Sequence, residues 1–343
     1  MIISLSRSFR LLIIALPVLL SFFMIHSHIK NENSSIISQH IYTILDQYRI
    51  TYDIDQRSID PSTTTDPREV HGSKECIQNI AHFVANNVPI TMLMVGFPFK
   101  SSNREKKVIG HLPDMAERKS LEYLQKMLDE IAAIYKPGAN ILVFCDGVVF
   151  AEYFDIPLSD VTAYETALKK LAADMPHITI FSSGDVMQKH GLKTASEIIT
   201  LIDNHEPSDT QFRAKVTSVP ETALKRIGFE LDHTQGKILV EKYGLDEIVM
   251  QLLAREMRLR TYIEKTFPVD AFFRLTVHFS SDLQKKFGIR LSPTSDITPY
   301  HGVLVEEKDS SWSIQFKKDI DTQNYTLCSL LVNEILCHYF KRK

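Results

Sequence analysis

The sequence predicts an α/β protein, a three-layer sandwich with helices on both faces of a mainly parallel sheet and a β-rich C-terminal portion. Three short apolar runs suit buried strands, and a helical pattern follows each one: Thr91–Phe97, Asn140–Phe144 and His177–Phe181. Strand-then-helix units in series favour parallel pairing, because the helix returns the chain to the same edge of the sheet. The last third of the chain instead alternates apolar and polar residues, as half-buried strands do.

The composition is that of an ordinary globular protein. The 343 residues are enough for one large or two modest domains, with 44% apolar and 24% charged residues. A formal net charge of -3 argues against a nucleic-acid-binding surface spread over the whole molecule. The four cysteines have neither C-x-x-C spacing nor a partnering histidine pattern typical of zinc. We therefore expect free thiols, no bound metal, no nucleic-acid partner and a reducing, cytoplasmic location.

The first 30 residues conflict with that expectation. Arg7 and Arg10 precede the mostly apolar run Leu11–Ile25, which is short for a membrane-spanning helix and is interrupted by Pro17. Three interpretations stay open: an uncleaved anchor, an export signal, or a start assigned too early, with Met24 as the true initiator. We favour the third slightly. If the segment is an anchor, the protein is associated with a membrane.

The rest of the chain divides into a short N-terminal part and a catalytic domain. We assign residues 1–30 to the apolar segment, 31–73 to a helix and a polar linker, and 74–343 to an α/β catalytic domain with the β-rich part at its end. Ser35–Arg49 has apolar residues on one helical face. Thr51–Ser73 is polar, contains two Asp-Pro pairs and predicts a loop. A helix over Lys74–Ala85 then leads into the first strand.

The next helix has a clear start signal. It is predicted to begin at Leu112-Pro113-Asp114 and to run to about Tyr135. Asp114 is the expected N-cap, and Glu117, three residues later, completes a capping-box pattern. Capping is therefore a complete structural explanation for both acids.

Three further features follow the second strand. Asp146 stands directly after it, where it suits a ligand or the next turn equally well. Ser159 or Asp160 is predicted to cap a helix over Val161–Ala173, and residues 187–236 are expected to be helical. A long helix is predicted over Leu245–Lys265, and we expect its arginines on a solvated face: Arg255, Arg258 and Arg260.

The last third is predicted to hold strands and a closing helix. Ala271–Phe279 alternates like a strand, Gly302–Glu306 and Ser311–Phe316 suit a hairpin, and Asn324–Lys341 suggests a helix. Several cationic or titratable side chains accompany these strands: Arg274, His278, Lys285, Lys286, Arg290 and His301. Such residues could line a pocket or could be edge charges that oppose aggregation.

A basic loop follows the first predicted strand, at the carboxyl edge where open α/β sheets bind ligands. It offers the cations Lys100, Arg104, Lys106 and Lys107, and the hydrogen-bonding groups Ser101, Ser102 and Asn103. These groups could hold an anionic substrate. A loop of this composition is also common as a solvated connection, and its spacing matches no glycine-rich phosphate loop.

Several separated pieces of the sequence together resemble one family, the isocyanide (isonitrile) synthases related to pyoverdine and dityrosine biosynthesis proteins. The pieces occur in a shared order over about residues 75–305: Phe97–Asn103, Leu112–Glu117, Asp146–Phe150, Asp160–Tyr164, Phe273–Leu275, His278, Lys286–Leu291 and Thr298–Val303. The sequence departs from the family pattern at Ser102, Val148 and Tyr300, where proline, a polar residue and tryptophan are usual. These departures could alter the shape of the pocket or the choice of substrate.

The resemblance implies a Rossmann-like enzyme of secondary metabolism. Such an enzyme converts the α-amino group of L-tyrosine or L-tryptophan into an isonitrile, and takes the new carbon from the ketone of ribulose 5-phosphate. No redox cofactor is implied, because the carbon skeleton of the sugar is itself rearranged and broken. A downstream oxygenase could act on the product.

This chemistry assigns tasks to residues, as hypotheses. A base must take a proton from the amine, and His278, His301 and Asp146 are the catalytic candidates. Cations must hold the phosphate and the carboxylate, and the remaining substrate-binding candidates are Lys100, Ser101, Asn103, Asp114, Glu117, Arg274, Lys286 and Arg290. A Schiff base on Lys100 is conceivable but not required, because the substrate brings its own amine.

Two other classes of function stay open. Formyl or other one-carbon transfer to tyrosine would use a similar aromatic pocket. A non-catalytic protein that binds a phosphosugar or an amino acid would be compatible with the apolar N-terminal segment.

Overall fold

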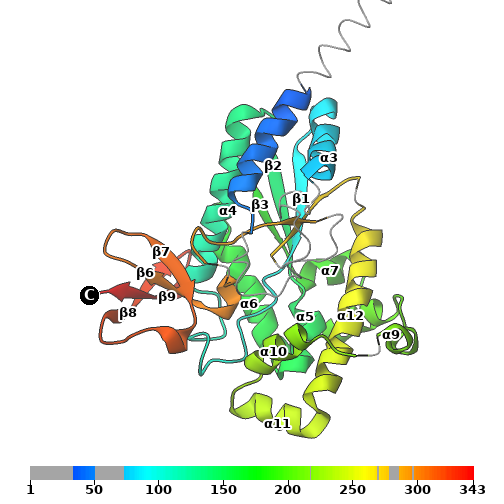
Figure 1. Cartoon of the computed structure of the whole chain (residues 1–343), viewed down its shortest axis with the longest axis vertical. Helices are drawn as coiled ribbons and strands as arrows, with labels where there is room; N and C mark the ends of the chain where they lie inside the picture. The colour runs from blue at the N-terminus through cyan, green and yellow to red at the C-terminus, as the bar shows by residue number, and fades with distance from the viewer. Residues whose placement is uncertain (1–33, 51–72, 217, 269, 278–285, 296) are drawn as a thin grey trace, which may run out of the picture.

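A computed structural model of the protein describes residues 34–50 and 73–343, apart from 217, 269, 278–285 and 296 (Figure 1). The apolar N-terminal segment, most of the polar linker and the candidate base His278 thus lie outside the described residues. Within the described residues, no helix is long and apolar enough to cross a membrane.

The main sheet has five parallel strands in the order β3-β2-β1-β4-β5. They are β1 Ile90–Val95, β2 Ala139–Phe144, β3 Ile178–Phe181, β4 Phe273–Thr276 and β5 Phe287–Gly288. The first three are the predicted apolar runs, and the predicted parallel sheet is confirmed. β2 and β3 are added in turn on one side of β1, and β4 and β5 are then added on the other side. Ligands of open α/β sheets bind at such a reversal, beyond the carboxyl ends of the strands.

Alternate side chains of the strands enter two different cores, which makes the protein three layers thick. Met92 and Met94 of β1 pack on one face of the sheet, and Leu93 packs on the other. The first core contains the helix 34–47, α3 (Ser73–Asn86) and α4 (Met115–Ile134), and the second contains α12 (Leu245–Thr266). The predicted helices on both faces are confirmed (Figure 1).

Shorter helices fill the chain between β2 and α12, as predicted for residues 187–236. They are α5 Gly147–Phe150, η2 Ala151–Phe154, α6 Leu158–Leu171, α7 Ser183–His190, α8 Ala195–Asp203, α9 Asp209–Lys215, α10 Glu221–Glu230 and α11 Thr234–Tyr243. The predicted cap of α6 was wrong, since the helix begins at Leu158 with Pro157 as N-cap. Proline has no N–H to satisfy, and Asp160 instead lies in the first helical turn, where its charge suits the helix dipole.

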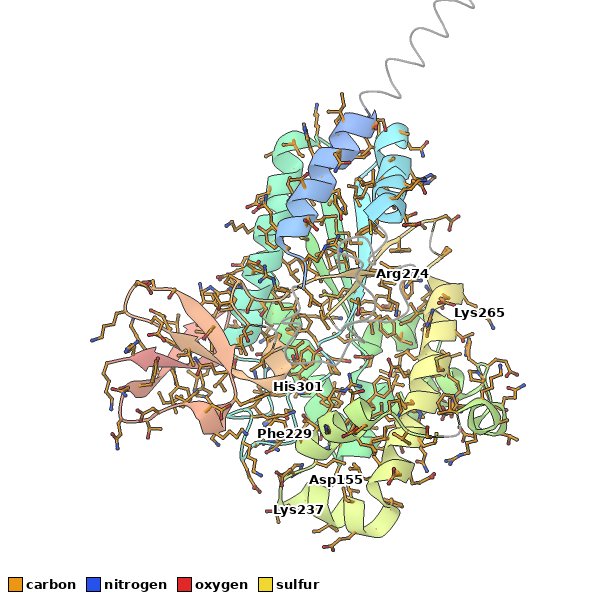
Figure 2. All side chains as sticks on the ribbon, viewed as in Figure 1. Asp155, Phe229, Lys237, Lys265, Arg274 and His301 are labelled. Atoms are coloured by element: carbon orange, nitrogen blue, oxygen red, sulfur yellow. The ribbon has the colours of Figure 1, made fainter. Side chains whose placement is uncertain are left out.

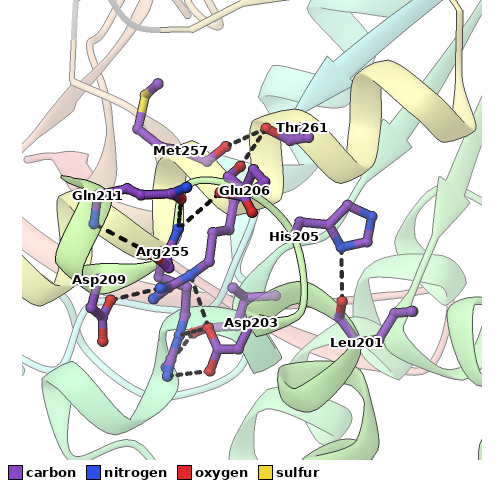
Figure 3. Close-up of polar contacts among 12 residues, drawn as sticks. Leu201, Asp203, His205, Glu206, Asp209, Gln211, Arg255, Met257 and Thr261 are labelled. Carbon is purple, nitrogen blue, oxygen red and sulfur yellow. Dashed lines mark hydrogen bonds and ion pairs between the residues drawn. The ribbon is translucent and has the colours of Figure 1, made fainter.

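The expectation that the arginines of α12 line a solvated face was wrong for two of them. Arg255 and Arg258 are 8% and 6% exposed. Arg255 Nη2 lies 2.9 Å from Asp203 Oδ2, and Arg258 Nη1 lies 2.6 Å from Asp209 Oδ1 (Figure 3). These carboxylates belong to α8 and α9, far from α12 in the sequence. The arginines therefore fasten those helices to α12, which the helical pattern alone could not indicate.

The C-terminal portion forms a second sheet, in the order β7-β6-β9-β8. Its strands are β6 Val303–Glu306, β7 Trp312–Gln315, β8 Tyr325–Val332 and β9 Ile335–Arg342. The predicted hairpin of β6 and β7 and the β-rich character are confirmed. The predicted closing helix was wrong, because β8 and β9 pair as an antiparallel hairpin. Asn333 and Glu334 turn the chain with φ values of 46° and 68°, which asparagine tolerates and glutamate rarely adopts.

The loops that leave β1 and β2 touch through a glycine. A Cβ atom on Gly147 would stand 1.9 Å from the carbonyl oxygen of Pro98 and 2.8 Å from Val161 Cγ1. The peptide after β1 can approach the start of α5 only because position 147 has no side chain. This contact brings the basic loop beside Asp146.

We expect Gly147→Ala to lower the free energy of unfolding by about 1–3 kcal/mol or more, the usual cost of overpacking, because the backbone must move to make room for the new side chain. Urea unfolding should detect the loss. Gly184→Ala in α7 is the matched control, because its Cβ would meet only Ser182 Oγ, at 3.5 Å. The control should be neutral or stabilising. Equal stability of the two variants would contradict the close packing of the two loops.

Candidate active site

Lys100, in the loop after β1, is buried between two acidic side chains. Its Nζ lies 2.7 Å and 2.9 Å from the two carboxylate oxygens of Glu117 and 3.0 Å from Asp114 Oδ2. It also donates to the carbonyl oxygen of Pro299, at 3.1 Å. An ammonium has three N–H donors, so protein groups already engage the whole charge. The predicted substrate cation thus has a structural task, which is to hold η3 (Pro299–His301) against the loop.

The capping box predicted for α4 is present, and its two acids, Asp114 and Glu117, are the ones that contact Lys100. Asp114 accepts from the amide of Ala116 at 2.8 Å, and Glu117 Oε2 accepts from the amide of Asp114 at 2.9 Å. Glu117 Oε1 also accepts from the hydroxyl of Tyr164 at 3.2 Å. Burial raises the pKa of Glu117 to about 8, with Lys100 opposing the shift.

A second buried group of charges surrounds Glu230, the last residue of α10. Its carboxylate accepts hydrogen bonds from the Ser101 hydroxyl, from the backbone amide of Ser102 at 3.1 Å, and from the Lys107 ammonium. Asn103 Nδ2 donates to the carbonyl oxygen of Phe229 at 2.9 Å. The predicted binding residues Ser101 and Asn103 therefore clamp the basic loop to α10. Sequence reasoning missed Glu230, because nothing in a mixed helical stretch distinguishes it from a surface acid.

Glu230 also orients His301. His301 Nδ1 is buried and lies 3.2 Å from Glu230 Oε2, within ion-pair distance but without the geometry of a hydrogen bond, while 32% of the histidine side chain stays exposed. Burial lowers the pKa of His301, with Glu230 opposing the shift, so the ring is mostly neutral near pH 7. The carboxylate favours the tautomer with the proton on Nδ1, which leaves the lone pair on Nε2, away from Glu230. The geometry thus provides an imidazole that can accept a proton.

Asp146, directly after β2, carries a carboxyl group that does not cap the following helix. It occupies the N-cap position of α5 without a side-chain capping bond, and its buried Oδ1 has no hydrogen-bond partner among the described residues. Burial, reinforced by the charges of Glu256 and Glu165, raises its pKa to about 7. A carboxyl group that titrates near neutral pH can both give and take a proton.

Tyr300 lies between these two titratable groups. The amide of Ser101 donates to its carbonyl oxygen at 2.8 Å, and its fully buried ring packs edge-on against Phe97. Burial raises the pKa of its hydroxyl, and the charge of Asp146 adds to that shift. Tyr300 precedes His301 in the chain, so the charge of Asp146 acts on the residue next to His301.

The cationic candidates of the C-terminal third do not gather at one point. Arg290 donates to the backbone carbonyls of Pro293 and Gln47, both at 3.3 Å, beside the N-terminal helix. Arg274 Nη2 donates to the carbonyls of Ile263, at 3.3 Å, and Phe267, and so binds the last turn of α12. Figure 2 shows it well separated from His301.

Lys286, just before β5, belongs to the same neighbourhood as Arg274. Its side chain is exposed at the surface, yet the protein packed around the ammonium lowers its pKa, and the charges of Arg260 and Arg274 add to the shift, whereas Glu256 opposes it. Glu256 also acts on Asp146. Glu256 on α12 thus lies within electrostatic range of both Asp146 and Lys286. Within the described ranges, no group of three or more His, Cys, Asp or Glu side chains is arranged to hold a metal ion.

Residues 80–328 match the family model described as Pyoverdine/dityrosine biosynthesis protein. The chain belongs to this family. The predicted resemblance is thus confirmed. An L-tyrosine isonitrile synthase of Pseudomonas aeruginosa is 31% identical over 247 residues, which cover 68% of this chain and 74% of that protein. One of Xenorhabdus nematophila is 28% identical over 247 residues, covering 66% and 71%.

Other family members extend the range of substrates and confirm the fold. An L-tryptophan isonitrile synthase of Fischerella ambigua is 27% identical over 244 residues, which cover 67% of this chain and 72% of that protein. The crystal structure of the PvcA protein of Pseudomonas aeruginosa superposes with a TM-score of 0.74 at 24% identity, over 89% of this chain and 99% of that one. These relatives support the prediction of an enzyme of the isocyanide synthase kind.

Proposed function

We propose that the protein is an isonitrile synthase that acts on L-tyrosine or L-tryptophan and takes the isonitrile carbon from ribulose 5-phosphate. The observation that carries the proposal is the presence, in a member of this family, of two side chains suited to proton transfer. His301 is a neutral imidazole oriented by Glu230, and Asp146 is a carboxyl group with a pKa of about 7. Both act at the carboxyl edge of the sheet, where a substrate can reach them.

The proton-transfer steps need this pair. The amine of the amino acid must lose a proton before its nitrogen can attack the ketone, and His301 Nε2 can accept that proton. The ketone oxygen must gain a proton before it leaves as water, and protonated Asp146 can donate it. Both substrates must be held together, because orientation of two reactants removes a large part of such a barrier.

The sugar phosphate belongs at the other end of the region. Arg274 binds the end of α12 and lies well apart from His301 (Figure 2), and the charge of Arg274 acts on Lys286. The phosphate of ribulose 5-phosphate stands at the opposite end of the sugar from the reacting ketone. We therefore place the ketone near Asp146 and the phosphate toward Lys286 and Arg274. The buried Lys100 network keeps η3 in position and does not itself bind the phosphate.

The test is mass spectrometry of the full chain incubated with tyrosine or tryptophan and ribulose 5-phosphate labelled at the ketone carbon. The expected product gains one labelled carbon and loses two hydrogens relative to the amino acid. A formamide, which gains carbon and oxygen with no change in hydrogen, would instead support one-carbon transfer. Consumption of neither substrate by folded protein would contradict both enzyme functions and favour a binding protein.

A further inference from the structure

Arg226 of α10 is an arginine that the functions described above do not use. It lies one helical turn before Glu230, and residues four apart share a face of a helix. Glu230 in turn contacts His301, at 3.2 Å. The helix therefore places Arg226 on the side of α10 that faces the candidate base.

The charge of Arg226 is available to a ligand. Its side chain is exposed, and no other residue in the described part of the chain forms a hydrogen bond or ion pair with it. The neighbouring cations differ: Lys107 is held by Glu230, and Lys225 pairs with Glu221 at 2.7 Å. The charge of Arg226 acts on both His301 and Tyr300. It is thus an unpaired guanidinium within electrostatic range of the imidazole.

The proposed chemistry requires a cation at this place. The amine and the carboxylate of an α-amino acid are attached to the same carbon. If His301 takes the proton from the amine, the carboxylate must therefore bind close to His301 as well. A planar guanidinium can bind a carboxylate through two parallel hydrogen bonds. Arg274 lies too far from His301 to serve (Figure 2), and Arg290 lies beside the N-terminal helix.

We propose that Arg226 binds the α-carboxylate of the amino acid substrate and so holds the amine against His301. This inference rests on the proposed function, because it assumes an amino acid substrate. It also separates the two anions, with the carboxylate at Arg226 on α10 and the phosphate toward the cations beside α12.

The test is a binding cycle by calorimetry, with Arg226→Gln in the full chain. Tyrosine and tryptophan are compared with tyramine and tryptamine, which keep the amine and the ring but lack the carboxylate. Arg226→Gln should weaken binding of the amino acid about 10- to 100-fold, as expected for loss of charge-assisted hydrogen bonds, and should leave binding of the matching amine nearly unchanged. Lys225→Gln, the adjacent residue on the same helix, should alter neither.

The outcomes that overturn the proposal are equally defined. Equal losses for amino acid and amine would mean that Arg226 acts on something other than the carboxylate. A loss confined to ribulose 5-phosphate would assign Arg226 to the phosphate. Binding of neither aromatic amino acid to the wild-type protein would also reject it. Because the cycle needs no turnover, a protein that binds tyrosine through Arg226 but forms no isonitrile would refute the proposed function and leave this inference standing.

A second measurement tests the position of Arg226 without any substrate. The groups that face His301 are Glu230 and Arg226 on α10 and Lys107 in the basic loop. The Arg226 charge lowers the pKa of His301, so Arg226→Gln should raise it in an NMR titration, whereas Lys225→Gln should not. An unchanged His301 pKa in Arg226→Gln would place the arginine too far away to hold the substrate.

Discussion

Asp146→Asn should lower kcat for isonitrile formation by about 10²- to 10⁴-fold, the usual contribution of a positioned acid or base. The amide has nearly the same shape but cannot transfer a proton. Steady-state kinetics with both substrates would measure the loss. Asp155→Asn is the matched control, because Asp155 is exposed and has a φ of 52°, which asparagine accepts. Retention of full activity by Asp146→Asn would remove Asp146 from the mechanism.

The same variant should be more stable than the wild type at alkaline pH, which distinguishes a functional group from a structural one. Burial raises the pKa of Asp146 from 3.8 to about 7. A group with a raised pKa stabilises the fold fully below its unfolded pKa and loses that contribution as pH rises through its folded pKa. Each pKa unit corresponds to about 1.36 kcal/mol, so at pH 8 the ionised Asp146 lowers the free energy of unfolding of the wild type by at most about 4 kcal/mol. Partial exposure of the carboxylate makes the true value smaller. The advantage of Asp146→Asn should therefore be absent near pH 4, grow as pH rises and be complete above pH 7 in urea unfolding.

Glu230→Gln should lower both stability and activity. It leaves the Lys107 ammonium buried without a charged partner, and breaking a buried ion pair by removing one member costs roughly 3–5 kcal/mol. It also removes the carboxylate that fixes the tautomer of His301, so we expect kcat to fall by about 10²-fold or more. Glu221→Gln on the same helix is the control, since its partner Lys225 is exposed, and it should change neither quantity measurably.

The stability difference between Glu230→Gln and the wild type should depend on pH in the opposite sense to that of Asp146. Burial would raise the pKa of Glu230, but the charges of His301 and Lys107 outweigh it and hold that pKa well below its ordinary value of 4.5. A group whose pKa is lower in the folded than in the unfolded state stabilises the fold at pH values above its unfolded-state pKa. That stabilisation is lost as pH falls toward its folded-state pKa. The gap between the two proteins should thus be full at neutral pH and should narrow below pH 4.5. A gap that is constant from pH 7 to pH 3 would show that Glu230 acts through packing alone.

Parts of the candidate site could be predicted from the sequence because they depend on local order. The apolar strand before the basic loop fixes Lys100 at a sheet edge, and the spacing of Asp114 and Glu117 is that of a helix start. The position of Asp146 after β2 follows in the same way. The roles of these residues were harder to predict from the sequence. The sequence offered Lys100 as a substrate cation, whereas its three donors are engaged by Glu117, Asp114 and Pro299.

The sequence by itself determined the parallel sheet, the capping of α4 and the family, because strand periodicity, cap spacing and the order of motifs all lie within short stretches of chain. Only the tertiary structure decided which distant charges meet. Glu230 reaches His301, and Arg255 reaches Asp203, because the packing of α10, α8 and α12 brings these distant residues together. The turn between β8 and β9 was likewise decided by tertiary packing, since residues 324–341 carry a local pattern compatible with a helix. Burial and ion pairing act between residues far apart in sequence, and no local pattern records them.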